Sequence, residues 1–421
     1  MSQADPLSRQ SSPEPAPGRY LRVRRATLEL CRHLTTEDMV VQSMPDASPT
    51  KWHLAHTSWF FERFVLEPLQ AGYRAFNPDW HLLFNSYYQS AGAMFNRPER
   101  GLLSRPGVTD IVRYRQHVDE HMGTLLAQHP ADPVISARVD LGLNHEQQHQ
   151  ELLLTDIKHA LSLNPLKPAY RNGAPALGAD APEAVYVACE GGIVPCGARE
   201  NGFCFDNETP RHEVLLQPFQ LASRLVTNGE YREFVRDGGY RRAEHWLSDG
   251  WATVQQRQWQ HPLYWSPELD SEFTLLGEIE LDPARPVCHV SYYEADAFAR
   301  WAEARLPGEA EWESVACQQA VAGNLLDDDR LHPTPAGTAP LPAQLYGDVW
   351  EWTHSPYSAY PGFRPLEGSL GEYNGKFMCN QLVLRGGSCL TWREHLRPSY
   401  RNFFYPDARW QMSGIRLARD A

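Results

Sequence analysis

The sequence lacks several features that mark familiar classes of protein. Its 8 cysteines include no Cys-x-x-Cys pair, which argues against a zinc ribbon or a thioredoxin-like site. No apolar run approaches the roughly 20 residues that a membrane-spanning helix needs. The net charge of −13 argues against a nucleic-acid surface, because phosphate recognition needs clustered basic side chains. We therefore expect a globular cytoplasmic protein with free thiols and with neither a nucleic-acid nor a membrane partner.

The length and the changes in composition predict two domains. A chain of 421 residues exceeds what one small core usually holds. Residues 1–18 are rich in Ser, Pro and Gln, and this composition predicts a disordered tail rather than a signal peptide. Residues 166–184 are rich in Pro, Gly and Ala, which is typical of a linker. We expect one domain over residues 19–165 and a second over residues 185–421.

The two halves show different periodicities. Helical apolar spacing marks four long segments of the first half, at residues 21–44, 49–69, 108–129 and 133–162. They predict a four-helix bundle, in which polar ligands can point inward from facing helices. The second half has short β-like runs broken by Gly and Pro, and two helices are expected at residues 227–239 and 291–306. This pattern predicts an irregular α+β domain.

The strongest chemical signal is the pair His145 and His149 in LNHEQQHQELLL (143–154). Because they lie four residues apart on a predicted helix, both imidazoles can bind one metal ion. The segment also has the letters HExxH of zinc proteases, in which Glu146 would act on a metal-bound water. Two histidines on one helix face are also common as a simple polar patch, so this motif by itself leaves metal binding open.

A third ligand is available in WHLAH (52–56), on the second predicted helix. Either His53 or His56 can face the metal while the other lies at its flank, or both can be structural residues between helices. Three imidazoles without a carboxylate leave coordination positions open, which suits Fe(II) chemistry with O2 and suits zinc equally. The spacing does not choose the metal.

Motifs from both halves resemble one enzyme family. SPTKWHLAHTSWFFE, NSYYQ, RPERGLLSRP and LNHEQQHQELLLTDIKHAL are similar to the DinB-like domain of ergothioneine sulfoxide synthases (EgtB). The second half resembles the formylglycine-generating or sulfatase-modifying domain in FDNETPRH (205–212), RPVCHVSYYEADAFARWAEARLPGEAEWE (285–313), GDVWEWT (347–353) and LRGGS (384–388). The resemblance implies an α+β chain with an N-terminal DinB-like four-helix bundle and a C-terminal C-type-lectin-like domain.

The resemblance also implies a non-haem Fe(II) centre. Its ligands fall on His56, His145 and His149, and His53 is then a neighbour that does not bind the metal. Glu151 completes the family's HxxxHxE signature. Because Glu151 leaves the ligand face of the helix, we expect it to support the site from outside or to be structural.

Substrate-binding residues follow from the same resemblance. Gln148 matches a glutamine that contacts the imidazole of hercynine, and Asn402 matches an asparagine at its trimethylammonium-carboxylate end. Phe403 lines that pocket, and an aromatic face suits a quaternary ammonium. Arg97 and Arg100 match arginines that hold the carboxylate of the thiol substrate, a task for which guanidinium groups are suited.

At two places this sequence differs from the branch of the family that uses γ-glutamylcysteine, and both differences bear on which thiol is the substrate. Phe404 stands where the branch that uses γ-glutamylcysteine has an acidic residue. That branch has its catalytic tyrosine in the region where this chain has Leu370 and Tyr373. The branch that uses free cysteine has a tyrosine pair in the first domain instead, and Tyr87 and Tyr88 match it. Both departures favour cysteine as the donor and one of this pair as the proton donor.

The resemblance thus implies Fe(II)- and O2-dependent formation of a C–S bond between hercynine and cysteine, giving a sulfoxide. The alternatives are a selenoneine synthase that uses a selenosugar, an ovothiol-type synthase, and a zinc hydrolase or thiol transferase on the DinB scaffold. A carbohydrate-binding module would fit a lectin-like second half but leaves the histidines unused. Apart from the resemblance, the tyrosines and arginines are interpreted as loop anchors and surface charges.

Overall fold

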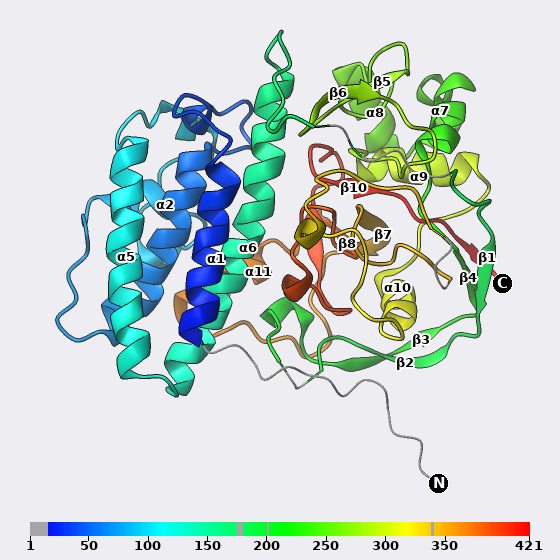
Figure 1. The fold of residues 1–421 in the computed structure, drawn as a ribbon. Coiled ribbons are helices and arrows are strands. Elements are labelled where there is room, and N and C mark those ends of the chain that lie inside the picture. The colour runs from blue at the N-terminus through cyan, green and yellow to red at the C-terminus, as the bar shows by residue number, and fades with distance from the viewer. Residues whose placement is uncertain (1–15, 174, 176–179, 200–201, 338–340) are drawn as a thin grey trace.

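The computed structural model describes residues 16–173, 175, 180–199, 202–337 and 341–421, and Figure 1 shows a helical bundle beside a mixed domain. The expected tail, residues 1–18, lies outside the described residues except for 16–18, which begin the first helix. Part of the expected linker, at 174 and 176–179, also lies outside them. The domain boundaries at residues 165 and 185 stay predictions.

Four long helices form the bundle, as the periodicity predicted (Figure 1). They are α1 (Ala16–Cys31), α2 (Thr50–Phe61), α5 (Val108–Gln128) and α6 (Pro133–Ser162). The first is shorter than expected, because the chain leaves it after Cys31 and then forms a 3-10 turn at Asp38–Val40. After α2 the chain continues through a π-helical turn (Glu62–Leu66) into α3 (Glu67–Leu69). The connection between α3 and α5 holds α4 (Trp80–Phe84) and 3-10 turns at Gln89–Ala91 and Arg97–Leu102.

A glycine allows α6 to approach α2 closely. A Cβ atom on Gly142 would lie 2.6 Å from Cε1 of Phe61, so no larger residue fits without a shift. Gly142 precedes His145 by three residues, about one helical turn, and so shares its face. The approach therefore brings the histidine face of α6 against α2.

The second domain consists of short strands and helices, as expected for an irregular α+β fold. One sheet has the order β10 (Ser413–Gly414), β7 (Trp350–Pro356), β8 (Leu382–Arg385), β9 (Asn402–Phe404), and β10 and β7 are parallel. A second has the order β1 (Tyr186–Cys189), β4 (Phe219–Ala222), β11 (Ala418–Asp420). Two antiparallel pairs are β2 (Gly192–Cys196) with β3 (His212–Leu216), and β5 (Ser271–Thr274) with β6 (Gly277–Glu280).

The helices of the second domain are α7 (Asn228–Arg236), α8 (Ser248–Arg257), α9 (Tyr292–Trp301), α10 (Glu309–Ala316) and α11 (Glu372–Lys376). Of these, α7 and α9 are the two that the sequence predicted. The sequence did not predict α8, α10 and α11, which are short. Within the described residues, no helix has both the length and the apolar character needed to cross a membrane.

A buried carboxylate joins the two domains. Glu151 on α6 accepts hydrogen bonds from Nε1 of Trp350 at 2.8 Å and from the hydroxyls of Ser388 and Thr391, both at 2.6 Å. Trp350 belongs to GDVWEWT and Ser388 to LRGGS. These two motifs of the second domain therefore dock, through Glu151, on the helix that carries the histidine pair.

Candidate metal centre

Three histidines converge between α2 and α6. Ligand nitrogens of His56, His145 and His149 all lie within 4.8 Å of one another, and Nε2 of His56 is 3.2 Å from Nε2 of His145. His56 and His145 are buried, and His149 is partly exposed. The i,i+4 pair and one histidine of WHLAH thus form a single cluster.

The chemistry of this cluster fits a divalent first-row metal. Burial lowers the pKa of His145 to about 4, and burial followed by the neighbouring histidines lowers the pKa of His56 and of His149 well below the usual value. The three imidazoles are therefore neutral at pH 7 and keep a lone pair for a metal. Nδ1 of His56 donates to the carbonyl oxygen of Phe84 at 2.6 Å, which leaves Nε2 as its ligand atom. Nδ1 of His145 is buried without a hydrogen-bond partner in the described structure. Three neutral imidazoles suit iron or zinc and leave coordination positions open.

Two tryptophans hold the ring of His56. Trp52 stacks on it with 4.6 Å between ring centroids and 14° between ring planes, and Trp59 stacks with 5.6 Å and 15°. Both tryptophans belong to α2, one turn before and one turn after the histidine. The ring orientation is therefore set by local helix geometry as well as by the bond to Phe84.

His53 lies next to the cluster rather than in it. Its Nδ1 is 2.9 Å from Nδ1 of His149, and its Nε2 is 3.1 Å from a carboxylate oxygen of Asp156. Among the described residues, the group of mutually close ligand atoms does not include it.

The cluster opens on a cavity of about 380 Å³ between the two domains. The bundle and the second domain each supply one wall of it. The expected site residues that line it are His56, His149, Gln148, Tyr87, Arg97, Arg100, Asn402, Phe403 and Phe404. His145 and Tyr88 are buried outside this lining.

Comparison with known proteins agrees with this architecture. Residues 19–153 match the DinB superfamily, and residues 176–338 and 342–421 match the sulfatase-modifying factor enzyme 1-like domain. The hercynine oxygenase of Mycolicibacterium smegmatis is 34% identical over 411 residues, which cover 90% of this chain and 92% of the relative. That of Mycobacterium tuberculosis is 33% identical over 449 residues, covering 97% and 100%.

The chain belongs to the hercynine oxygenase (EgtB-like) family. The formylglycine-generating enzyme of Streptomyces coelicolor is 28% identical over 279 residues, which cover 52% of this chain and 84% of that enzyme. The predicted fold class, a DinB-like helical domain followed by a sulfatase-modifying, C-type-lectin-like domain, is confirmed.

In this family member, two arginines line the cavity without a direct ion-pair partner among the described residues. Arg100 is 4% exposed and donates to the hydroxyls of Ser48 at 3.0 Å and Ser86 at 2.8 Å. Burial, followed by the charge of Arg97, lowers the pKa of Arg100 to about 9. Arg97 donates to the hydroxyl of Tyr87 at 2.5 Å. Within the part of the chain that the structure describes, neither guanidinium forms an ion pair with a carboxylate, so both can accept an anionic guest.

Tyr87 and Tyr88 lie in different environments. Tyr87 lines the cavity with a φ of +69°, whereas Tyr88 packs in the bundle core, with ring centroids 5.0 Å from Phe64 and 5.8 Å from Trp59. Burial raises the pKa of Tyr88. Tyr373 of the second domain also lines the cavity, and its ring lies 6.0 Å from that of Tyr87. The alternative tyrosine suggested by the sequence therefore shares a corner of the cavity with Tyr87.

Gln148 is held by the second domain. Its Nε2 donates to the hydroxyl of Tyr400 at 2.7 Å, and that hydroxyl lies 3.1 Å from Nε2 of His395. Nδ1 of His395 is in turn 3.0 Å from Oδ1 of Asn144 on α6. Sequence reasoning missed Tyr400 and His395, because nothing in the local pattern indicates that they meet α6.

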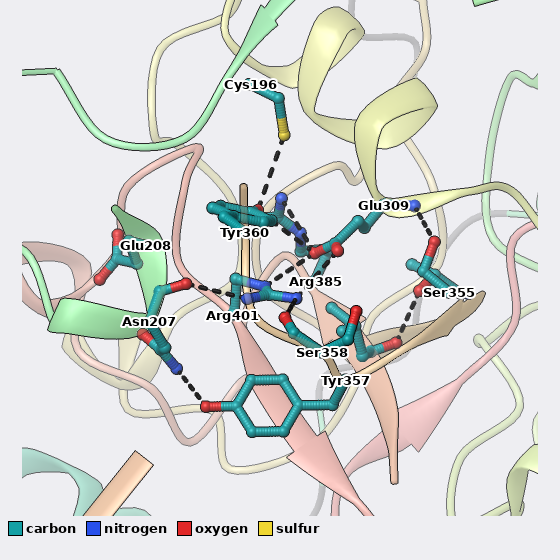
Figure 2. Close-up of polar contacts among 12 residues, drawn as sticks. Cys196, Asn207, Glu208, Glu309, Ser355, Tyr357, Ser358, Tyr360, Arg385 and Arg401 are labelled. Carbon is teal, nitrogen blue, oxygen red and sulfur yellow. Dashed lines mark hydrogen bonds and ion pairs between the residues drawn. The ribbon is translucent and has the colours of Figure 1, made fainter. Parts of the chain in front are cut away.

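Figure 2 shows a cluster of polar side chains in the second domain that includes Arg401, Glu309, Asn207 and Tyr357. Arg401 forms a two-point ion pair with Glu309, at 2.9 and 3.0 Å, and donates to the carbonyl of Asn207 at 2.9 Å. Nδ2 of Asn207 donates to the hydroxyl of Tyr357 at 2.9 Å. The ring of Tyr357 stacks on Phe403 with 4.0 Å between centroids and 10° between planes. The aromatic face expected at Phe403 is thus fixed from behind.

Glu146 does not face the histidine cluster. It pairs with Arg24 at 3.0 Å and with Arg115, and it accepts a hydrogen bond from the hydroxyl of Thr27 at 2.5 Å. Burial alone would raise its pKa, but the two arginines outweigh burial and lower it. The zinc-protease interpretation of HExxH, with Glu146 as the base, is therefore wrong, because the carboxylate belongs to an ion-pair network in the bundle core.

The cysteines are all free, as expected. Cys389, which follows LRGGS, is buried, and Cys379 is exposed. Burial raises the pKa of Cys196 to about 12, and its sulfur lies near the carboxylate of Glu313 and the hydroxyl of Tyr360. We therefore assign these thiols no part in the chemistry.

Proposed function

We propose that the protein is a non-haem Fe(II), O2-dependent sulfoxide synthase that joins a carbon of the hercynine imidazole to the sulfur of cysteine. The observation that carries the proposal is a cluster of three neutral histidines, of which His56 and His149 line a cavity that Arg97 and Arg100 also line. Two relatives of similar length carry the name hercynine oxygenase, which supports hercynine and O2 as substrates.

His56, His145 and His149 would hold the metal. Iron bound there would supply open positions for both substrates and for O2, together with the redox chemistry that joins them. The protein's contribution is to orient the ligands and substrates and to keep bulk water out.

The arginine pair would bind the carboxylate of cysteine. A carboxylate between Arg97 and Arg100 would form the ion pair that neither arginine forms among the described residues, where Asp156 acts on both without a direct contact. Each charge-assisted hydrogen bond gained in this way contributes roughly 1.5–3 kcal/mol. The cation of Arg100 also lies 3.4 Å from the ring centroid of Trp52, so its position is fixed before the substrate arrives.

Hercynine would lie between α6 and β9. Gln148 would contact its imidazole and is held for this by Tyr400. Asn402 and Phe403 would hold the other end, where the ring face of Phe403 suits the trimethylammonium group. The stack on Tyr357 keeps this ring from turning away.

Free cysteine fits the cavity better than γ-glutamylcysteine. Phe404 packs at 5.8 Å from the ring of Trp410 and offers no charge to a glutamyl ammonium group. Asp407, three residues further on, is paired with Arg257 at 2.6 Å. A selenosugar, as in a selenoneine synthase, has no carboxylate for the arginines.

Tyr87 is the proton donor that we favour. It lines the cavity, and its hydroxyl accepts a hydrogen bond from Arg97, which leaves the phenolic proton available for donation. Tyr88 lies in the core, and Tyr373 remains the competing donor at the same corner.

The test is an aerobic assay of the Fe(II)-loaded protein with hercynine and competing donors, followed by product mass. We expect a hercynine–cysteine sulfoxide and O2 consumption that depends on both substrates. Turnover of the selenosugar alone would assign the protein to selenoneine synthesis. Activity with zinc and without O2 would instead support the hydrolase or transferase.

A further inference from the structure

A line of three side chains leads from the proposed metal ligand His149 to a buried carboxylate. Nδ1 of His149 is 2.9 Å from Nδ1 of His53, and Nε2 of His53 is 3.1 Å from Oδ2 of Asp156. Asp156 is 5% exposed and His53 is 2% exposed, so water does not compete for these bonds. Asp156 follows His149 by seven residues on α6, two helical turns along the same face.

The carboxylate fixes the direction of both hydrogen bonds. Ionised Asp156 can only accept, so Nε2 of His53 must donate to it. A neutral imidazole has one N–H, and Nδ1 of His53 must then accept from Nδ1 of His149. This leaves the lone pair of His149 on Nε2, which is the nitrogen free to bind a metal. The opposite direction would put a proton on that nitrogen and prevent binding.

Asp156 is itself held from two other segments. Its Oδ2 also accepts from the backbone N–H of Ser48 at 2.8 Å, and its Oδ1 accepts from Nε1 of Trp410 at 3.3 Å. Ser48 precedes α2, and Trp410 belongs to the second domain. The position of the Asp156 carboxylate therefore does not depend on His53, so the carboxylate can orient the rings of His53 and His149.

The three proposed ligands differ in this outer support. Nδ1 of His56 donates to a neutral carbonyl, and Nδ1 of His145 has no partner in the described structure. Among the described residues, His149 is thus the one ligand of the three that is linked to a carboxylate. A negative charge behind an imidazole raises its basicity toward a metal and fixes its tautomer.

We propose that His53 and Asp156 are positioning residues that set the tautomer and orientation of His149 and thereby the affinity for the metal. The proposal rests on the proposed function, since it takes His56, His145 and His149 as the ligands. Loss of comparable outer partners typically weakens metal binding about 10–100-fold. His53 then matters for the metal although it does not bind it.

The experiment measures the Kd of the metal-free full-length protein for Fe(II) under anaerobic conditions, and for Co(II) by its visible absorption. The variants are His53→Ala, Asp156→Asn, the double variant, and the control Trp410→Phe. Trp410→Phe deletes the other side-chain donor to Asp156 but leaves the line intact. Thermal unfolding of each metal-free variant reports whether it folds.

We expect His53→Ala to raise the Kd about 10–100-fold and Asp156→Asn to raise it less. The double variant should match His53→Ala, because Asp156 acts on the metal only through that ring, and such coupling appears as non-additivity. Trp410→Phe should leave the Kd unchanged. Imidazole added to His53→Ala should restore part of the affinity and of the parent Co(II) spectrum.

A Kd within twofold of the parent in both single variants would overturn the inference, as would effects that add in the double variant. Failure of the proposed metal site looks different. In that case the parent itself binds no metal, or it binds one that His145→Ala does not release.

Discussion

The bundle and the second domain contribute to the cavity in opposite ways. The bundle supplies the three histidines from two regular helices, where residue spacing alone places side chains on a face. The second domain supplies Asn402 and Phe403 from a strand of three residues, backed by a polar cluster drawn from distant segments. Metal-binding side chains on long helices can therefore be predicted from residue spacing, whereas the positions of side chains on short strands depend on tertiary packing.

The largest effect is expected at the ligand cluster. Replacing His56, His145 or His149 with alanine removes one of three donors, so stoichiometric iron and turnover should both be lost. His53→Ala should still reach stoichiometric iron at saturating metal, with the weaker affinity argued above. Metal analysis and O2 uptake measure this. Iron retained by His56→Ala but lost by His53→Ala would show that the other residue of WHLAH is the ligand.

The arginine pair should give the next largest effect. Arg97→Ala or Arg100→Ala removes a charge-assisted contact of roughly 1.5–3 kcal/mol, so the KM for cysteine should rise about 10–100-fold. Hercynine binding should change little, because its proposed contacts lie on α6 and β9. Steady-state kinetics with each substrate varied in turn separates the two. An equal loss for both substrates would mean that the arginines only hold the loop.

The tyrosines test whether one corner of the cavity is shared by both domains. Tyr87→Phe keeps the ring and deletes the proton, so the product should shift from sulfoxide toward oxidised thiol while both substrates still bind. Tyr88→Phe is the matched control, because that ring lies in the core. Product ratios by mass spectrometry decide between them. A shift in Tyr373→Phe but not in Tyr87→Phe would move the proton donor to the second domain.

The domain interface should show a smaller effect that depends on pH. Burial raises the pKa of Glu151, although hydrogen bonds from Ser388, Thr391 and Trp350 oppose the rise. Because the folded pKa lies above the unfolded one, protonation of Glu151 stabilises the fold as pH falls through the folded value, and this gain is complete below about 4.5.

Glu151→Gln cannot gain this stability. The difference in unfolding free energy between parent and variant should therefore shift in favour of the parent on acidification, by about 1.4 kcal/mol per unit of pKa elevation. Chemical denaturation between pH 4 and 8 measures it. A flat difference would show that the carboxylate has the same pKa in both states.

The smallest effect is expected for the choice of thiol. Phe404→Asp places a carboxylate where a glutamyl ammonium could bind, so kcat/KM for γ-glutamylcysteine should rise relative to cysteine by a few-fold, as for an exposed charge pair of about 0.2–1 kcal/mol. Phe404→Leu is the control for loss of the ring. An unchanged ratio in Phe404→Asp would mean that Phe404 does not contact the donor.

Within the bundle, much of the structure followed from the sequence. The helices expected at 108–129 and 133–162 appear as α5 and α6 with nearly the same ends, because long apolar periodicity and the cap at Asp132 are local signals. In the second domain the helix expected at 291–306 appears as α9, and its cap by Ser291 and Glu294 is again a local signal. The short helices α8 and α10 carry too little periodicity to stand out.

By itself, the sequence determined that His145 and His149 share a helix face and that a third histidine stands in WHLAH, because helix geometry depends only on neighbours along the chain. Residue spacing left His53 and His56 equivalent, and the tertiary structure places His56 in the cluster and His53 between His149 and Asp156. It also decided that Glu146 turns into the core, and that Tyr87 rather than Tyr88 reaches the cavity. These outcomes depend on which distant segments pack on each side chain, and no local spacing encodes that.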